Sequence, residues 1–232
     1  MIYNIFGEEY APKFSLPLGG KFTNGDFIPI DLSTSNSDLK TGKTDDVSGL
    51  HEYVFGKIAA ANAKCAYGGY NENRDLYQRS DHFSDHADFR SVHLGIDFWM
   101  PAGTDVIACM PGSIHSFQNN DNPGDYGPTI ILEHFIGNEK IHSLYGHLSK
   151  ISLKGLFKGQ IINRGQKIGT LGTPDENIDW PPHLHFQLIK DIGDFQGDYP
   201  GVCHTKDKDF YLKNCPDPME FFKRGWSKKL AY

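Results

Sequence analysis

The sequence predicts a mainly β protein with an antiparallel sheet or sandwich at its core, and three observations favour this fold class. From about residue 88, short runs rich in β-branched and aromatic residues alternate with Gly, Pro and Asp, which is typical of strands separated by turns. That region contains no helix-length amphipathic segment. The 16 Phe and 11 Tyr in a chain of 232 residues supply enough apolar surface for a substantial core.

The individual elements follow from local patterns. Apolar residues at helical spacing (Val54, Ile58 and Ala61) predict a short helix within 51–64, and the Gly- and Asn-rich segment 68–75 predicts a loop. Asp217 can cap a C-terminal helix through 221–226, with Pro218 at its first position. Strands are predicted at 95–100, 105–110, 113–117, 129–135, 140–148, 166–172 and 183–189.

Three regions are predicted along the chain. Residues 1–87 are expected to wrap the core as an N-terminal extension, because they have too little periodic apolar pattern to fold alone. Residues 88–195 form the predicted core, and 196–232 a C-terminal segment with a short helix.

Charge and hydropathy exclude some classes of partner. The net charge is −6 and basic runs are absent, so nucleic acid is not expected as a partner. The apolar stretches are far shorter than the roughly 20 residues of a membrane span. The first residues lack the pattern of a secretory signal, which predicts a cytoplasmic protein, or a periplasmic or extracellular one if a leader has been removed.

The four cysteines lack the close spacing of a CxxC pair. We expect reduced structural thiols, with a Cys203–Cys215 bridge left open.

The chemistry-bearing residues fall into three motifs. His93 and Asp97 are four residues apart, and in the strand predicted at 183–189, His183, His185 and Gln187 share one face. Imidazole nitrogens and carboxylate oxygens are good zinc ligands. The third motif places Tyr145 and His147 at the same strand parity. His82 and His86 are interpreted as structural.

These motifs resemble those of the lysostaphin-type (LytM-like) zinc endopeptidases. HLGID, PAGTDVIAC, YGHLS, KGQIINRGQKIGTLG and PHLHFQL occur in the order and approximate spacing of that family, over roughly residues 88–190. The resemblance implies a duplicated-hybrid-motif fold and one Zn²⁺ per chain. It implies the metal ligands His93, Asp97 and His185, the catalytic residues His147 and His183 beside the water, and supporting roles for Tyr145 and Gln187.

The implied activity is zinc-dependent hydrolysis of a peptide bond by a metal-activated water. The substrate would be a peptidoglycan cross-link or another small-residue peptide. Which of the two catalytic histidines is the general base stays open, as does the oligomeric state. The alternative is a non-catalytic or occluded binding protein on the same fold, in which Asn71, Glu72 or Asn73 of the N-terminal segment covers the metal. Arg74 could recognise a substrate carboxylate, but a surface arginine is the simpler interpretation.

Two further hypotheses account for fewer of these motifs. A sugar-phosphotransferase-type phosphocarrier would use His93 as phosphoryl acceptor with a second histidine about fifteen residues upstream, where Gln78 stands. A purely structural zinc site fits poorly, because three His and Asp ligands leave one coordination position open.

Overall fold

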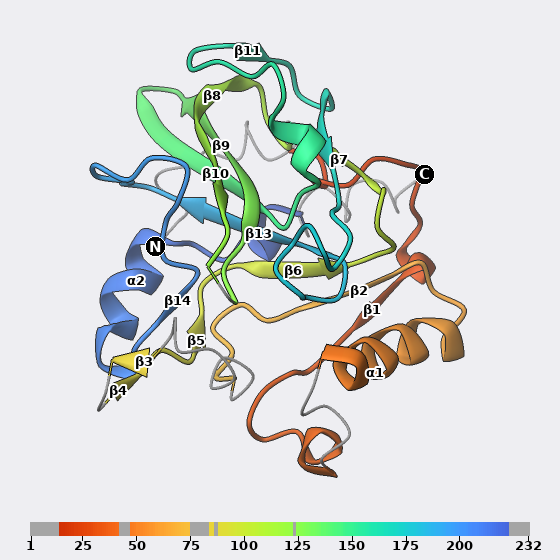
Figure 1. Cartoon of the computed structure of the whole chain (residues 1–232). Coiled ribbons are helices and arrows are strands. Elements are labelled where there is room, and N and C mark those ends of the chain that lie inside the picture. The colour runs from red at the N-terminus through yellow and green to blue at the C-terminus, as the bar shows by residue number, and fades with distance from the viewer. Residues whose placement is uncertain (1–13, 42–46, 75–83, 86–87, 123, 223–232) are drawn as a thin grey trace.

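The computed structural model describes residues 14–41, 47–74, 84–85, 88–122 and 124–222 of the chain. Its centre is an eight-stranded sheet with the order β1-β2-β6-β13-β10-β9-β8-β11, shown in Figure 1. Neighbouring strands are antiparallel except for β1 and β2, which are parallel. The strands are β1 (Phe27–Pro29), β2 (Cys65–Gly68), β6 (Ile96–Trp99), β8 (Gly112–Asn120), β9 (Gly127–Ile136), β10 (Glu139–Gly146), β11 (Ile161–Ile162) and β13 (His183–Ile189).

Three two-stranded sheets and short helices complete the described part of the chain. The pairs are β7 (Asp105–Ile107) with β12 (Lys167–Thr170), β5 (Val92–His93) with β14 (Val202–Cys203), and β3 (Ser84–Asp85) with β4 (Asp88–Phe89). The helices are α1 (Val47–Ala60), α2 (Lys208–Asn214) and the 3₁₀ turns η3 (Asn24–Asp26), η4 (Ser37–Thr41), η7 (Lys150–Leu153) and η8 (Thr205–Asp207). The prediction of a mainly β fold with an antiparallel sheet is confirmed, and all seven predicted strands are present.

The strand β13 separates the apolar core from the polar site. Leu184, Phe186 and Leu188 belong to the main hydrophobic cluster, together with Val106 of β7 and Ile168 of β12. Because side chains alternate along a strand, the residues between them point to the other face of the sheet. The predicted division of this strand into an apolar and a polar face is therefore confirmed.

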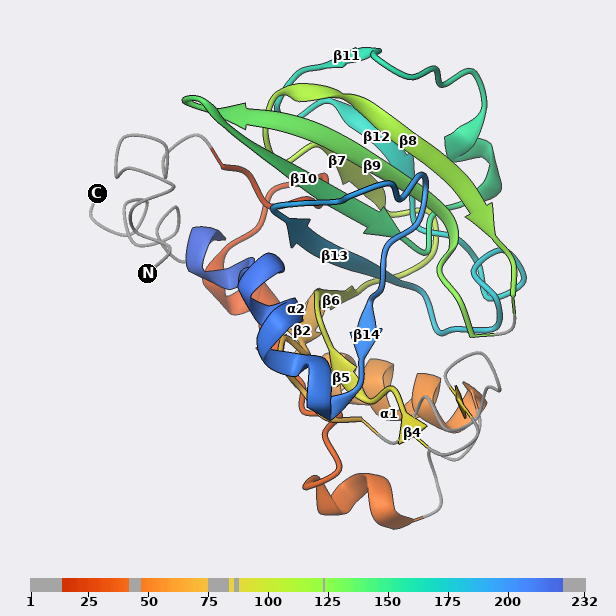
Figure 2. The same ribbon diagram turned by 90° about the vertical axis from the view of Figure 1, so that its left-hand side faces the viewer.

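The predicted N-terminal helix is present as α1. Val54 and Ile58 are buried and pack with Trp99 of β6 in a second apolar cluster, whereas Ala61 follows the end of the helix. Figure 2 shows α1, α2, β5 and β14 at the end of the molecule away from β11. The helix therefore covers the part of the sheet that carries β6.

The helix α2 was not predicted. It has only seven residues, too few for apolar periodicity to appear, and Tyr211 and Leu212 pack against a third apolar cluster. The predicted cap at Asp217 is present, because its Oδ1 accepts a hydrogen bond of 2.8 Å from the Met219 N–H. Residues 219–222 are helical, and the rest of the predicted C-terminal helix lies outside the described residues.

Segments on both sides of the predicted core contribute to its sheets. β1 and β2 extend the central sheet beyond β6, and β14 pairs with β5. The boundaries at residues 87 and 195 stay predictions. All four cysteines are buried and unpaired in the structure, which has no Cys203–Cys215 bridge, and their redox state stays a prediction. Among the described helices, none has the length and hydropathy to cross a bilayer.

Candidate metal centre

Three side chains from neighbouring strands direct one atom each to a common point. His93 lies on β5, Asp97 on β6, and His185 is the register partner of Asp97 on β13. His93 Nε2 lies 2.9 Å from His185 Nδ1, and each of these nitrogens lies 3.3 Å from Asp97 Oδ1. All three residues are buried. The strand pairing thus brings together the motif of His93 and Asp97 and the motif that contains His185.

The proton of His93 is placed by a backbone carbonyl. Nδ1 lies 3.0 Å from Gly69 O, and a carbonyl oxygen can only accept a hydrogen bond, so Nδ1 carries the proton. Nε2 then presents a lone pair to the other two residues. Burial, followed by the charge of Arg74 and opposed by Asp97, lowers the pKa of His93 to about 4, which favours this neutral form.

His185 has the opposite tautomer. The amide of Gln187 donates from Nε2 to Pro200 O at 3.1 Å and to Cys215 Sγ at 3.3 Å, so its Oε1 is left to accept from His185 Nε2 at 2.9 Å. The proton of His185 is therefore on Nε2, and Nδ1 presents a lone pair.

Asp97 divides its two oxygens between different partners. Oδ2 accepts a hydrogen bond of 2.6 Å from Arg74 Nη1, whereas Oδ1 is buried and receives no hydrogen bond from the described residues. Burial opposes ionisation of Asp97, but the adjacent His93 and the charge of Arg74 outweigh it and hold its pKa well below the usual range. Oδ1 is thus a negatively charged oxygen that lacks a donor.

This donor set fits a zinc ion. Two imidazole lone pairs and one carboxylate oxygen face one another, and the group satisfies the spacing for three ligands of one metal ion. Ligands about 2.0–2.2 Å from a tetrahedral zinc lie roughly 3.3–3.6 Å apart, close to the observed separations. Without a cation between them, the lone pairs and the carboxylate would repel one another.

Two further histidines lie beside this group. His183 precedes His185 by two residues on the same face of β13, and its Nε2 lies 4.0 Å from Asp97 Oδ1. Its Nδ1 donates a 2.7 Å hydrogen bond to Pro181 O, and its ring stacks on Trp99 with centroids 4.2 Å apart. The His147 ring lies 4.0 Å from the His183 ring, centroid to centroid. The structure therefore brings all five predicted site histidines and aspartates together.

Burial keeps both rings neutral at pH 7. For His183, burial lowers the pKa to about 4, against the opposing effects of Asp97 and the Pro181 carbonyl. For His147, burial, followed by His183 and His185, lowers the pKa well below the usual range. Since Pro181 fixes the proton of His183 on Nδ1, its Nε2 is a free proton acceptor directed toward Asp97.

The expectation that Tyr145 faces the site is wrong. On β10, Tyr145 is opposite Phe186 and points into the main core, where its hydroxyl accepts a hydrogen bond of 3.1 Å from the Cys109 N–H. The strand ends at Gly146, and His147 has φ = +60° in the left-handed region, so the alternation of side chains breaks between the two residues. Gln187, by contrast, contacts a ligand as expected.

The N-terminal loop contacts the site in another way than predicted. Asn71 and Asn73 are exposed, and the Glu72 carboxylate binds Arg74 and the Leu32 N–H, so none of these three directs a ligand to the metal position. Arg74 is buried and bonded to Asp97, which corrects its interpretation as a surface residue. Its sequence context, a polar loop, gave no sign of this contact. His82 and His86 lie outside the described residues.

The metal centre opens into a cavity of about 220 Å³. Apolar and aromatic side chains form part of its wall, and four charged residues other than Asp97 reach it. Among the described residues before 88, only Arg74 lines the cavity. The other lining residues include Arg90, Trp99, Asp125, Tyr126, Trp180, Phe195, Asp198 and Tyr199. The cavity therefore combines charged and aromatic side chains beside the metal centre.

Comparison with known proteins identifies the family. Residues 91–197 match the profile of peptidase family M23. The chain carries a domain of this peptidase family, whose members are in general zinc-dependent, and the lysostaphin-type resemblance is confirmed. A match to a peptidase profile disfavours the phosphocarrier hypothesis.

Three relatives illustrate the similarity. The chain is 39% identical to the peptidoglycan DD-endopeptidase ShyA of Vibrio cholerae serotype O1 over 195 residues, which cover 76% of the chain and 43% of ShyA. It is 34% identical to the DD-carboxypeptidase/endopeptidase Mpg of Neisseria meningitidis serogroup B over 97 residues, 41% of the chain and 20% of Mpg. It is 36% identical to lysostaphin of Staphylococcus staphylolyticus over 99 residues, 42% of the chain and 18% of lysostaphin. The chain thus spans less than half the length of each relative.

Proposed function

We propose that the chain is a zinc-dependent endopeptidase that hydrolyses a peptide bond of peptidoglycan. The observation that carries this proposal is that His93 Nε2, His185 Nδ1 and Asp97 Oδ1 converge on one point. The other ring nitrogen of each histidine and the other oxygen of the aspartate are held by hydrogen bonds to neighbouring groups. Three protein ligands leave one position of a tetrahedral ion open, which is the arrangement of catalytic rather than structural zinc. When bound, zinc supplies Lewis acidity that polarises a carbonyl group and acidifies water.

His183 is the proposed proton acceptor. Its Nδ1–H is fixed on Pro181 O at 2.7 Å, so Nε2 takes up the proton of the attacking water. The imidazolium formed in this step is stabilised by the carboxylate of Asp97, whose Oδ1 lies 4.0 Å away. The same ring can then deliver the proton to the leaving amine.

His147 is proposed to contact the reacting peptide group of the substrate. Its Nδ1 is buried and lacks a hydrogen-bond partner among the described residues. The backbone hydrogen bond of the ring to Asn177 leaves Nδ1 as a hydrogen-bond acceptor. A buried polar nitrogen without a partner costs free energy, and a donor group of the substrate, such as a peptide N–H, would remove that cost. The neighbouring ring of His183 is neutral before proton transfer, so the two histidines do not repel each other in the resting site.

The names of the relatives support the substrate class. ShyA is named for DD-endopeptidase activity on peptidoglycan, and Mpg for both carboxypeptidase and endopeptidase activity. The compartment in which the chain acts stays a prediction. Trp99, Trp180 and Tyr126 contribute aromatic surface to the cavity, against which the apolar part of a peptide substrate can pack.

The test compares metal content and hydrolysis in the same samples. Wild type, His185→Ala and His51→Ala, an exposed histidine on α1, would be loaded with zinc, dialysed and assayed on peptidoglycan and on a glycine-rich peptide. We expect about one zinc per chain in wild type and His51→Ala, none in His185→Ala, and hydrolysis only where zinc is present. Circular dichroism would establish that the variants are folded.

The remaining outcomes separate the alternatives. Zinc without hydrolysis of either substrate would favour the non-catalytic or occluded binding protein. A folded wild type that does not retain zinc would contradict the proposal. Cleavage of the glycine-rich peptide alone would support the zinc peptidase activity but contradict peptidoglycan as the substrate.

A further inference from the structure

Residues of the segment 69–74, which precedes the M23 match, contact both the first histidine and the aspartate of the metal centre. The family profile begins at residue 91, whereas Gly69, Glu72 and Arg74 lie in the loop that follows β2. Gly69 O holds His93 Nδ1 at 3.0 Å, and Arg74 Nη1 holds Asp97 Oδ2 at 2.6 Å. Two of the three ligands are therefore oriented from outside the matched segment.

This loop is fixed to the strand that carries His93. The Asn71 N–H donates to His93 O, the His93 N–H to Glu72 O and the Arg74 N–H to Ser91 O, each at 2.9 Å. Gly69 has φ = +107°, and a Cβ there would lie 2.0 Å from Arg74 Nη2 and 2.9 Å from His93 Nδ1. The loop thus approaches the site so closely that only glycine fits at position 69.

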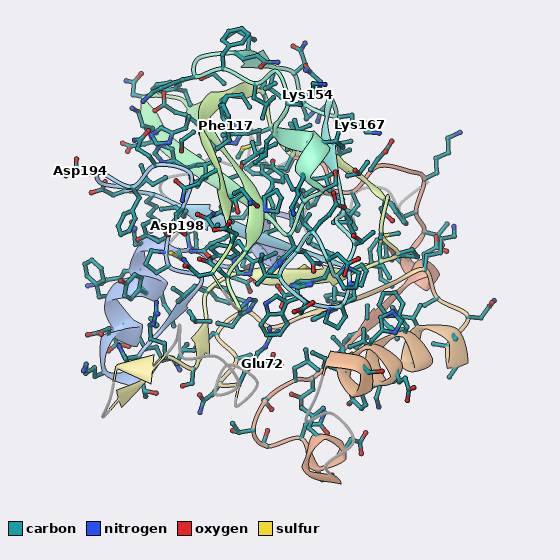
Figure 3. All side chains as sticks on the ribbon, in the orientation of Figure 1. Glu72, Phe117, Lys154, Lys167, Asp194 and Asp198 are labelled. Carbon is teal, nitrogen blue, oxygen red and sulfur yellow. The ribbon has the colours of Figure 1, made fainter. Side chains whose placement is uncertain are left out.

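The side chains form a continuous chain of contacts from the N-terminal segment to the metal position. Leu32 N donates to Glu72 Oε1 at 3.0 Å, Glu72 Oε2 binds Arg74 Nε, and Arg74 Nη1 binds Asp97 Oδ2. Arg74 and Asp97 are 3% and 1% exposed, so their ion pair is shielded from water and salt. Figure 3 shows Glu72 below the central sheet, on the side of the N-terminal segment and α1.

We infer that Arg74, oriented by Glu72, is a positioning residue that fixes Asp97 as a ligand through Oδ1 alone. The inference rests on the proposed zinc site. Arg74 occupies Oδ2 and so leaves one oxygen of Asp97 for the ion. Glu72 balances the charge of Arg74, so the pair does not add net positive charge next to the metal. Outer contacts of this kind contribute about 10- to 100-fold to metal affinity in zinc proteins.

Three substitutions test the inference, and each removes more of the contact between Arg74 and its partners than the one before. Glu72→Gln keeps an oxygen for the Leu32 N–H but removes the charge that orients Arg74. Arg74→Lys keeps the charge but cannot bind Glu72 and Asp97 with separate nitrogens, because its ammonium is a single point on a flexible stem. Arg74→Met removes the charge and approximately keeps the length. Arg164→Met, at an exposed turn, is the matched control.

The first measurement is the zinc dissociation constant of each folded protein, by competition with a chelating dye. We expect affinity to fall about 3-fold in Glu72→Gln, about 10-fold in Arg74→Lys and up to about 100-fold in Arg74→Met, with Arg164→Met unchanged. If Arg74→Met does not fold, the other two variants still decide the question.

The second measurement is the visible spectrum of the cobalt-substituted proteins, which reports the coordination number and does not depend on hydrolysis. We expect the Arg74 variants to gain the weaker bands of a higher coordination number, because the released Oδ2 can also bind the ion. Unchanged zinc affinity and an unchanged cobalt spectrum in both Arg74 variants would overturn the inference. Failure of the wild type to bind zinc would instead contradict the proposed function.

Discussion

At the scale of single residues, His93 and His185 present different ring nitrogens to the same point. The sequence motifs name the residues but contain no information on the tautomers, which depend on Gly69 O and on Gln187 Oε1. The group of three candidate ligands could be predicted from the motifs. Arg74 could not, because its role depends on a contact with Asp97 across 23 residues of chain.

Gln187 is expected to tune metal affinity through His185. Its Oε1 accepts a hydrogen bond of 2.9 Å from the His185 Nε2–H. Replacing Gln187 with leucine leaves that buried donor without an acceptor. We predict that Gln187→Leu lowers zinc affinity by about 10- to 100-fold, whereas Gln187→Glu, which keeps an acceptor, loses less. Chelator competition measures both. Equal affinities in wild type and Gln187→Leu would show that the contact does not orient the ligand.

His183 and His147 are expected to affect turnover more than metal binding. Neither belongs to the ligand group, and both lie beside it. We predict that His183→Gln and His147→Gln each retain about one zinc but reduce kcat by about 10²- to 10⁴-fold. Metal analysis and hydrolysis rates on one preparation measure the two effects. A folded His183→Gln without zinc would mean that this ring is itself a ligand.

At the scale of elements, the predicted side-chain directions were right where alternation continued along a strand and wrong where the backbone changed conformation. β13 keeps its alternation over seven residues, so its polar face could be predicted correctly. On β10 the alternation ends before His147, whose positive φ turns the side chain toward the site. The pairing of β2 with β6 was also beyond prediction, because it joins short segments about 30 residues apart without a local turn signal.

Gly95, in the turn between β5 and β6, is expected to be essential for the packing of these strands on β13. A Cβ at this position would lie 2.6 Å from both Cε1 and Nε2 of His185 and 2.8 Å from Phe186 O. Because Gln187 holds the ring and the sheet holds the backbone, neither can move cheaply. We predict that Gly95→Ala lowers zinc affinity at least about tenfold and reduces Tm.

The matched control for this substitution is Gly56→Ala. A Cβ at Gly56 in α1 would have open space around it. This change should leave zinc binding unaltered and raise the free energy of unfolding by about 0.5–1 kcal/mol, since alanine is a better helix former. A Gly95→Ala variant with normal zinc affinity would show that the strands can separate enough to admit a methyl group.

At the scale of the whole molecule, histidines that are buried and neutral in the core of the sheet make the free energy of unfolding depend on pH. His134 on β9 lies in the sheet, with Nδ1 2.9 Å from Pro111 O and Nε2 2.6 Å from Ser143 Oγ. Burial lowers its pKa to about 4, against the opposing effect of the Pro111 carbonyl. Unlike the site histidines, it lies outside the ligand group, so its titration can be studied without zinc.

The sign of the effect follows from the lowered pKa. In the unfolded chain His134 takes up a proton below about pH 6.5, whereas the folded protein resists protonation until about pH 4. The free energy of unfolding is therefore highest above pH 6.5 and falls as the pH decreases toward 4. For this one group the loss between pH 7.5 and 4.5 is about 2–3 kcal/mol.

Urea unfolding of zinc-free wild type and His134→Gln, followed by tryptophan fluorescence across this pH range, measures the contribution. Glutamine can still donate to Pro111 O and accept from Ser143 but does not titrate. We predict that the variant is less stable than wild type at pH 7.5 but loses about 2–3 kcal/mol less on acidification, so the two stabilities approach each other near pH 4.5. The site histidines remain in both proteins, and their titration cancels in the difference. Parallel pH profiles for the two proteins would place the acid sensitivity of the fold in other groups.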